Sequence, residues 1–364
     1  MRYNDIRRKT RSVAVGNLVI GGNAPIAIQS MTNTDTHDVA ATLAQIRALE
    51  AAGCDVARLT VPDLAAAETI TALKEAGVGI PLVADIHFDY RIAVACAERG
   101  VDKIRINPGN IGGEDNVRAV VNACRAHNVP IRIGVNGGSL EKHILAKYGA
   151  PTAEALVESA LYHAKLLEKF DFYDTVISMK ASGVSAMITA NRLLAERCDY
   201  PLHLGVTEAG DREMGSVKSA IGIGALLADG IGDTVRVSLT ADPLEEIGAA
   251  KRILSALSIE GQSGMNIVSC PTCGRTKIDL IALSARFRET VEREGLADLP
   301  LRVALMGCVV NGPGEAGEAD IGICGGDGEA LLIAKGKVLC KIPEADVIDV
   351  LIAELKNIKE ARSI

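Results

Sequence analysis

Three cysteines and one glutamate in the last hundred residues have the types and spacing of a metal or iron–sulfur site. Cys270 and Cys273 form a Cys-x-x-Cys pair, and such a turn directs two thiolates to one ion or cluster. Thirty-four residues separate Cys273 from Cys308, and six separate Cys308 from Glu315. Because the motif holds only three thiolates, we expect Glu315 to be the fourth ligand, with an oxygen that could be replaced.

The same residues allow other interpretations. Cys-Pro-x-Cys-Gly also opens zinc ribbons, but those need a second Cys-x-x-Cys, which this chain lacks. Cys324 is an alternative fourth thiol, although its surroundings resemble a strand and turn. From these residues alone an iron–sulfur cluster is favoured over zinc, and zinc over structural cysteines. Gly307, Gly312 and Gly314 would let the backbone fold closely around the bound group.

Basic residues recur at or near the ends of predicted strands in the first 240 residues. They are Arg58, Arg105, Arg132, Lys180 and Arg236, and the acidic residues at matching positions are Asp85 and Glu208. Burying the resulting excess of positive charge without partners would be costly. Arginine forks bind phosphate oxygens bidentately, so an anionic, phosphorylated ligand is favoured over internal salt bridges or outward-pointing side chains.

Four uncharged or weakly basic residues accompany these cations. Asn136, Thr207 and Ser238 lie beside them in the sequence and could orient the same ligand. His87 follows Asp85 by two residues at a strand end, which favours a functional over a structural histidine.

The residues that must position these groups form eight short apolar strands separated by helical segments. The predicted strands are 26–30, 56–60, 82–86, 103–107, 131–135, 175–180, 202–206 and 234–239. Eight such units predict a (β/α)8 barrel, with a doubly wound open sheet as the alternative. A hairpin over 12–22 should precede the barrel, with Gly16 and Asn17 at its turn.

The predicted barrel domain covers residues 1–258, and its last helix runs from Pro243 to Ser258. Residues 259–264 resemble a linker. The second predicted domain, 265–364, is a small α+β unit that holds the cysteine motif. Its expected elements are strands at 267–269, 301–306 and 320–324, a helix over about 276–294, a hairpin near Lys335 and a final helix from Pro343. The polar residues 354–364 are expected to fray.

Composition restricts the class of protein. With 364 residues and a net charge of −7, general nucleic-acid binding is not expected. Nine cysteines, an odd number without a pairing framework, indicate reduced intracellular thiols. No apolar signal core or membrane-length run is present, so we expect a cytoplasmic protein without a membrane partner. Neither a complete dinucleotide fingerprint nor a phosphate-binding P-loop is present.

Longer motifs resemble one known family, the bacterial 4-hydroxy-3-methylbut-2-en-1-yl diphosphate synthases of the two-domain type. They span nearly the whole chain: Gln29-Ser-Met-Thr-Asn-Thr34, Ala84-Asp-Ile-His-Phe88, Ile104-Arg-Ile-Asn-Pro-Gly-Asn-Ile111, Arg132-Ile-Gly-Val-Asn136, Gly138-Ser-Leu-Glu-Lys142, Thr207-Glu-Ala-Gly210, Gly232-Asp-Thr-Val-Arg-Val-Ser-Leu239, Cys270-Pro-Thr-Cys-Gly-Arg275 and Met306-Gly-Cys-Val-Val-Asn311.

The resemblance implies a 4Fe–4S cluster on Cys270, Cys273, Cys308 and Glu315. It implies reductive ring opening of 2-C-methyl-D-erythritol 2,4-cyclodiphosphate, with reduced flavodoxin or ferredoxin as electron donor. The substrate-binding residues that it implies are Arg58, His87, Arg105, Arg132, Asn136, Lys180, Thr207, Arg236 and Ser238. Glu208 would be a candidate proton donor, and Asp85 would support His87 or the charge balance.

Two other functions remain as alternatives: a zinc-bearing barrel lyase or transferase acting on a phosphorylated substrate, and a non-catalytic iron–sulfur carrier. The cationic strand ends argue against a carrier, which would not need them. For the assembly we expect a head-to-tail homodimer with cross-chain active sites. A short linker that leaves the barrel at the end opposite its active site could hardly carry the cluster domain around to the same barrel's mouth.

Overall fold

The computed structural model describes residues 3–259, 264–310 and 312–362. The chain divides into two compact units, Met1–Leu257 and Ser258–Ile364. The predicted linker, 259–264, consists mostly of residues 260–263, which lie outside the described residues.

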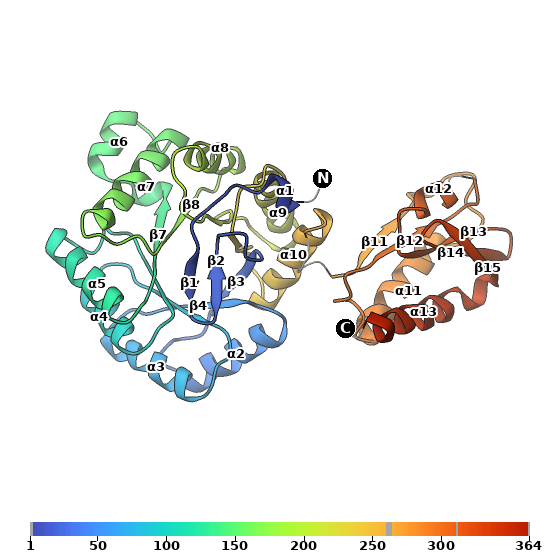
Figure 1. The fold of residues 1–364 in the computed structure, drawn as a ribbon, viewed down its shortest axis with the longest axis horizontal. Helices are drawn as coiled ribbons and strands as arrows, with labels where there is room; N and C mark the ends of the chain where they lie inside the picture. Colours follow the sequence, from blue (N-terminus) through green and yellow to red (C-terminus); the bar gives the residue numbers. More distant parts are fainter. Residues whose placement is uncertain (1–2, 260–263, 311, 363–364) are drawn as a thin grey trace. The chain divides into compact units, whose positions relative to one another are not determined.

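The first unit is a parallel eight-stranded barrel, which confirms the predicted (β/α)8 class (Figure 1). Neighbouring strands follow the order β8-β7-β6-β5-β4-β3-β10-β9, and a bridge between Ile177 and Leu202 closes the ring. The strands are β3 (Ala27–Met31), β4 (Val56–Thr60), β5 (Leu82–Asp85), β6 (Lys103–Ile106), β7 (Ile131–Asn136), β8 (Thr175–Lys180), β9 (His203–Leu204) and β10 (Thr234–Val235).

An outer layer of helices covers the strands, so both faces of the sheet are buried. These helices are α2 (Val39–Ala51), α3 (Leu64–Glu75), α4 (Tyr90–Glu98), α5 (Glu114–Ala126), α7 (Ala153–Glu168), α8 (Val184–Ala195), α9 (Arg212–Ala228) and α10 (Pro243–Ala256), with the shorter α1 (Tyr3–Ile6) and α6 (Lys142–Tyr148) outside the repeat. Five of them begin at an aspartate that caps the free N–H groups of the first turn: Asp38, Asp63, Asp89, Asp211 and Asp242.

The predicted N-terminal hairpin is confirmed as β1 (Val13–Val15) and β2 (Leu18–Ile20), with Gly16 in a left-handed conformation at the turn. Val13, Val15 and Ile20 pack against Val176, near the start of β8. Asn17 donates a hydrogen bond to the carbonyl of Gly79, shortly before β5. The hairpin therefore covers the N-terminal ends of the strands, opposite the end where barrel active sites lie.

The last two barrel strands are shorter than the sequence predicts. β10 ends at Val235 instead of Leu239, and β9 covers only two of the five predicted residues. Beyond β10 the N–H of Leu239 donates to the carboxylate of Glu246 rather than to a neighbouring strand. A side chain from α10 thus replaces a strand partner at this point.

The second unit is an α+β fold around a five-stranded mixed sheet. The strands, in their spatial order, are β11 (Asn266–Ser269), β12 (Arg302–Met306), β13 (Ile321–Gly325), β14 (Glu329–Ala334) and β15 (Lys337–Pro343). The first three are parallel and the last two antiparallel. The hairpin predicted near Lys335 is confirmed.

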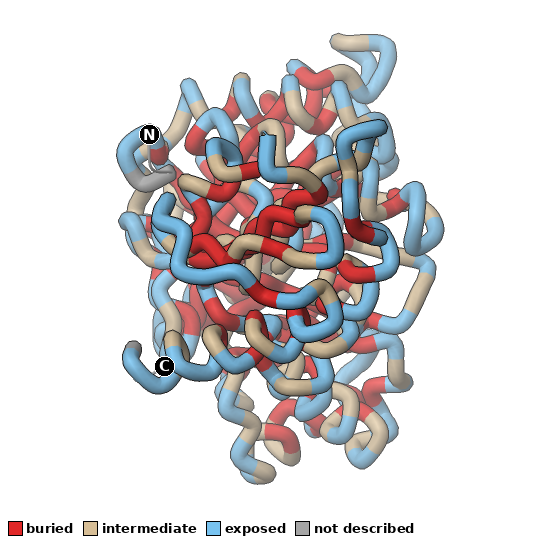
Figure 2. Tube along the Cα trace, turned by 90° about the vertical axis from the view of Figure 1, so that its right-hand side faces the viewer, coloured by how far each residue is buried: buried red, intermediate tan, exposed pale blue. Residues whose placement is uncertain are grey.

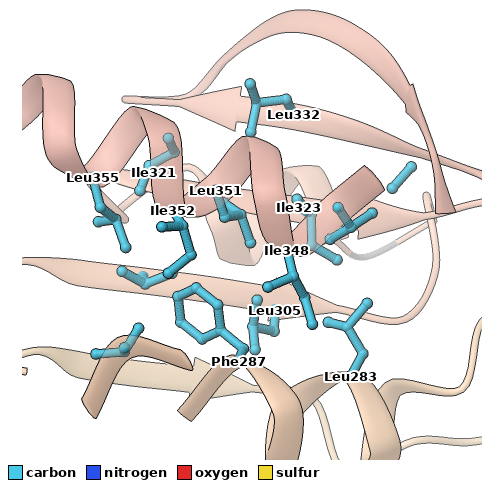
Figure 3. Packing of buried hydrophobic residues seen from close by; sticks show 14 of the residues in the cluster. Leu283, Phe287, Leu305, Ile321, Ile323, Leu332, Ile348, Leu351, Ile352 and Leu355 are labelled. Carbon is cyan, nitrogen blue, oxygen red and sulfur yellow. The ribbon is translucent and has the colours of Figure 1, made fainter. Parts of the chain in front are cut away.

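Two helices, α11 (Leu280–Arg293) and α13 (Val347–Arg362), pack on the sheet (Figure 3). Phe287 of α11 and Leu351 of α13 lie in this core with Leu305 and Ile323 of the sheet. A smaller cluster includes Ala316 of the short α12 (Gly312–Ala316), together with Met306 and Cys324.

The C-terminal helix differs from its prediction. It begins at Val347 rather than Pro343, because Pro343 ends β15. It continues to Arg362, so the expectation of fraying over 354–364 is wrong for 354–362, and 363–364 lie outside the described residues. Leu355 is fully buried, and it packs in the core between the helices and the sheet (Figure 3). Buried and exposed stretches alternate along the tube in Figure 2.

Candidate functional site

One cavity of the barrel brings together all nine residues predicted to bind substrate. Its volume is about 170 Å³, and Asp85, Gly134 and Ser178 complete its lining. The nine predicted residues are Arg58, His87, Arg105, Arg132, Asn136, Lys180, Thr207, Arg236 and Ser238. They come from seven strands, β4 to β10, or from the segments that directly follow them.

Strand alternation explains how one sequence supplies so many inward side chains. Residues two apart on β7, such as Arg132, Gly134 and Asn136, line the same cavity, as do Ser178 and Lys180 on β8. A Cβ atom at position 134 would lie 2.2 Å from Nε of Arg105, so any other residue there would displace the Arg105 guanidinium. The Arg105 guanidinium therefore occupies space that a side chain at position 134 of β7 would fill.

Asp85 forms the centre of the charge network on the β4–β6 side. Nη1 of Arg105 donates to its Oδ1 at 3.0 Å, and Nε of Arg58 lies 3.6 Å from its Oδ2. Burial raises the pKa of Asp85, but Arg58, Arg105 and Arg132 outweigh that effect and hold the pKa at about 2. The carboxylate is thus ionised at neutral pH and forms ion pairs with two arginines, Arg58 and Arg105.

Glu246 is the second carboxylate of this network, and the sequence analysis missed it. It reaches in from α10, is 4% exposed, and pairs with Arg236 at 3.2 Å. Ser30 donates to the same carboxylate at 2.9 Å. No motif marks Glu246, because its pairing joins a helix to a strand end and exists only in the folded barrel.

The cations of the cavity outnumber these carboxylates. Burial, together with neighbouring arginines, places the pKa of Lys180 well below its usual value, and the same is true of Arg132. Burial also lowers the pKa of Arg58 to about 10. Five cations line the cavity with Asp85, and Glu246 adds one further carboxylate beside Arg236, so a bound anion would supply the missing negative charge.

Buried polar residues near this network form a further layer that the sequence did not predict. Lys103, Gln29 and His203 are at most 1% exposed. Among the described residues, none offers a hydrogen-bond partner to Nζ of Lys103, Nε2 of His203, or the Gln29 amide. Burial and then Arg132 and Arg58 place the pKa of Lys103 well below its usual value. Residues that face the interior of a (β/α)8 barrel are usually apolar, so this layer is unusual.

The three residues predicted to be catalytic are placed differently from one another. Asp85 and His87 line the cavity, and Asp85 is buried while His87 is exposed. Glu208 is exposed and does not line the cavity, although its neighbour Thr207 does. Its φ of 52° is left-handed, which is uncommon for a residue with a side chain. Glu208 is therefore not the second carboxylate of the charge network.

A second cavity, in the α+β unit, is lined by all four predicted cluster ligands. Its volume is about 240 Å³, and it receives Cys270, Cys273, Cys308 and Glu315. Thr272 has φ of 65°, an outlier for a β-branched residue, at the turn between the first two thiols. The third thiol follows β12, and Glu315 lies on α12.

The local chemistry of this cavity suits thiolates. The N–H of Gly307 donates to Sγ of Cys270 at 3.3 Å. A backbone hydrogen bond from Arg275 lowers the pKa of Cys273. Among the described residues, no three Cys, His, Asp or Glu side chains converge closely enough for a single metal ion. Three thiols and a carboxylate around a cavity, rather than around a point, fit a group of cluster size.

Cys324 is buried and does not line the cluster cavity. It lies in β13, is fully buried, and burial raises the pKa of its thiol to about 12. Gly312 packs against it, since a Cβ at 312 would approach Sγ of Cys324 to 2.6 Å. Gly307 is similarly confined by Thr276, but Gly314 has open space around it, so the predicted need for glycine there is not supported.

These features define a class of protein: a (β/α)8 barrel with a polycationic cavity, in one chain with an α+β unit whose cavity is lined by three cysteines and a glutamate. The comparisons identify the family. Residues 10–251 match the GcpE TIM-barrel domain, and residues 266–357 match the GcpE protein C-terminal domain. The chain belongs to the GcpE family.

Curated relatives match almost the full length. Proteins named 4-hydroxy-3-methylbut-2-en-1-yl diphosphate synthase (flavodoxin) from Geobacter sulfurreducens and Ruminiclostridium cellulolyticum are 56% and 55% identical to it. The alignments cover 97% and 96% of this chain, and 99% and 98% of those proteins. The resemblance noted from the motifs is therefore confirmed.

Among solved structures, a dihydropteroate synthase of Yersinia pestis is similar over 68% of this chain and 98% of that one, with 12% identity and a TM-score of 0.48. A similarity of that level adds nothing to the assignment. Within the part of the chain that the structure describes, no helix has both the length and the apolarity of a membrane span.

Proposed function

We propose that this chain catalyses the two-electron reductive ring opening and dehydroxylation of 2-C-methyl-D-erythritol 2,4-cyclodiphosphate. The product is (E)-4-hydroxy-3-methylbut-2-enyl diphosphate, an intermediate of non-mevalonate isoprenoid biosynthesis. Relatives that match over almost their full length, at about 55% identity, are named as synthases of this product. The observation that supports it most directly is the barrel cavity, where five cations face Asp85 and Glu246 and a diphosphate would complete the charge balance.

The proposed binding roles follow from the geometry of the cavity. Arg58, Arg105, Arg132 and Arg236 present planar forks that suit phosphate oxygens, and Lys180 adds a compact charge. His87, Asn136, Thr207 and Ser238 supply polar groups that could orient the rest of the ligand. Asp85 and Glu246 keep the arginines in place before the ligand arrives.

Cys270, Cys273, Cys308 and Glu315 would hold a 4Fe–4S cluster. The family assignment supports an iron–sulfur group, and the donor set of three thiols and one carboxylate supports this type. When bound, such a cluster supplies electrons one at a time. The N–H of Gly307 donates to Sγ of Cys270, and a backbone hydrogen bond from Arg275 lowers the pKa of Cys273.

The oxygen that leaves as water needs a proton. Glu208 is our candidate donor, because it adjoins Thr207 at the edge of the cavity and its exposed side chain could be resupplied from solvent. Its left-handed backbone supports a functional role, since such conformations are costly and often occur at active sites. Asp85 would keep His87 and the arginines in a fixed electrostatic setting.

We further propose a cytoplasmic head-to-tail homodimer in which each α+β unit serves the partner's barrel. The support is the length of the linker, because six residues, 259–264, span at most about 21 Å when extended. Such a linker, starting at the end of the barrel opposite the active site, could hardly carry the α+β unit round to the mouth of the same barrel. Mixing an Arg132→Ala chain with a Cys270→Ala chain tests this arrangement. Heterodimers should regain one working site, whereas inactive heterodimers of stable chains would exclude it.

The proposed reaction is tested by anaerobic turnover of the cyclodiphosphate with a chemical reductant. Formation of the linear allylic diphosphate supports it, and a loaded, folded protein that leaves the substrate unchanged contradicts it. Iron and sulfide analysis with visible spectroscopy separates the proposal from a zinc-bearing barrel enzyme. A carrier without catalysis would hold the cluster but would not bind the cyclodiphosphate.

A further inference from the structure

A third cavity lies next to the proposed cluster cavity and shares its wall. The shared residues are Cys270, Pro271 and Thr272, and the remaining lining comes from Ser269 and from one face of α11. Its volume is about 390 Å³. Cys308 and Glu315 line only the cluster cavity, so the two cavities lie on different sides of the Cys270 turn.

Helix α11 presents to this groove an apolar side chain that does not take part in the core. Helix α11 buries Leu283, Phe287 and Val291 against the sheet, at helical spacing. Ile281, by contrast, is 74% exposed and lines the groove. An exposed apolar side chain in a groove beside a redox centre suggests a contact that the isolated chain does not make.

The rim of the groove is basic. Arg288 lines the groove and Arg275 lines the adjoining cluster cavity. Over residues 275–289 four exposed basic residues, which include Lys277 and Arg286, outnumber the two exposed acidic ones, Asp279 and Glu289. The net charge of the whole chain is −7, so this stretch has the opposite sign to the molecule as a whole. A basic rim attracts an acidic partner and repels a basic one.

We propose that this groove docks the electron donor, an acidic flavoprotein of the flavodoxin type that presents its flavin to the Cys270–Thr272 turn. The inference rests on the proposed function. Relatives with flavodoxin in their names support the identity of the donor, and the groove itself supports the position. The groove leaves the Cys308 and Glu315 side uncovered, so the donor and the substrate would approach from different sides.

The electron count balances. In each encounter the reduced flavin loses one electron and the iron–sulfur group gains one, and two encounters supply the two electrons of one turnover. Such encounters are brief and involve small interfaces. A short apolar contact with a charged rim matches these requirements better than an extended hydrophobic surface would, because the rim raises the association rate without holding the donor.

The test is the double variant Ile281→Asp/Arg288→Glu in the cluster-loaded full chain. With reduced flavodoxin, the Michaelis constant for the donor should rise about tenfold or more, as expected when an apolar anchor is lost and a charge reversed. Flavodoxin binding measured by calorimetry or NMR titration should weaken by the same factor. Turnover with a chemical reductant should be unchanged.

A control variant changes a different exposed surface of the same unit. Lys337→Glu/Val338→Asp changes another exposed basic–apolar pair, on the β14–β15 hairpin, and should leave flavodoxin binding intact. Unchanged donor binding and turnover in the groove variant would overturn the docking site while leaving the proposed reaction untouched. Wild-type protein that is inactive even with the chemical reductant would instead contradict the proposed function.

Discussion

The carboxylate of Glu246 accepts hydrogen bonds from Nε and Nη2 of Arg236, at 3.3 and 3.2 Å. Glu246 is buried, and Arg236, whose side chain is 15% exposed, lines the barrel cavity. Glu246 therefore fixes Arg236 in the ligand-free barrel, where no diphosphate neutralises it. Removing the carboxylate should leave an uncompensated buried cation.

Glu246→Gln should lower the free energy of unfolding of the ligand-free protein by about 3–5 kcal/mol, the scale for breaking a buried pair. Inorganic pyrophosphate should recover more stability in the variant than in wild type, because the anion replaces the lost charge. Thermal denaturation with and without pyrophosphate measures both. Glu245→Gln, which removes only a partly exposed pair with Arg212, should cost about 1 kcal/mol or less. Equal rescue of Glu246→Gln and wild type would contradict the prediction.

Lys103→Met should stabilise the ligand-free protein. Lys103 is fully buried, and within the described residues its Nζ has no hydrogen-bond partner, so an apolar side chain removes a desolvation cost. We expect a gain of about 1–4 kcal/mol, seen as a higher melting temperature, and a loss of anion affinity. Lys165→Met on the exposed face of α7 is the matched control and should change little. A destabilised Lys103→Met protein would show that Lys103 has a partner in solution.

The same variant should change the dependence of stability on pH. Because the native pKa of Lys103 is lowered, the unfolded chain holds more protons than the native one between that pKa and the ordinary lysine pKa of 10.5. The free energy of unfolding contributed by this group therefore rises with pH across that window. The advantage of Lys103→Met should be largest at low pH and vanish near pH 10.5. A constant difference across the range would argue against a titrating lysine.

Glu315→Ala should reduce the iron and sulfide retained after anaerobic reconstitution, and turnover with it. Cys324→Ser should largely spare both, because its buried thiol does not line the cluster cavity. Metal analysis and the visible absorption spectrum provide the measurement. Loss of the cluster in Cys324→Ser with retention in Glu315→Ala would reverse the ligand assignment.

Glu208→Gln preserves the shape of the side chain but cannot donate the proton of a carboxylic acid. We expect turnover to fall by roughly 10²-fold or more with little change in substrate affinity. Glu213→Gln, also exposed, on α9, is the control. Steady-state kinetics with a chemical reductant separates the two constants, and full activity of Glu208→Gln would remove this residue from the mechanism.

The extent to which the sequence predicts the site depends on how local each signal is. Arg105 and Arg132 were predictable because a charge within an apolar strand stands out, and strand alternation then determines which face it occupies. Cys270 and Cys273 form a motif by themselves. Glu246 and Lys103 do not stand out in the sequence, for different reasons. Glu246 lies on a helix and pairs with Arg236, which is distant from that helix until the barrel folds. Lys103 is the first residue of the predicted strand 103–107, a position where a lysine is usually solvated.

Strand boundaries show the same limit. The pattern over 234–239 favours a strand throughout, yet β10 ends at Val235, and the N–H of Leu239 bonds to Glu246 instead of to a neighbouring strand. Local propensity cannot anticipate a side chain that arrives from the next helix. The C-terminal helix was underestimated because polar composition hid the buried Leu355.

Met31 gives the barrel a sensitivity to oxidants that is separate from any iron chemistry. Its thioether sulfur accepts from Nε and Nη2 of Arg58, at 3.1 and 2.8 Å, and lies 3.7 Å from Nη1 of Arg236. Thioethers are weak acceptors, so both forks remain available to phosphate. Conversion to the sulfoxide would place a strongly polar oxygen between the two guanidinium groups. Air-damaged protein could then regain its cluster on reconstitution yet bind diphosphate poorly until methionine sulfoxide reductase repaired it.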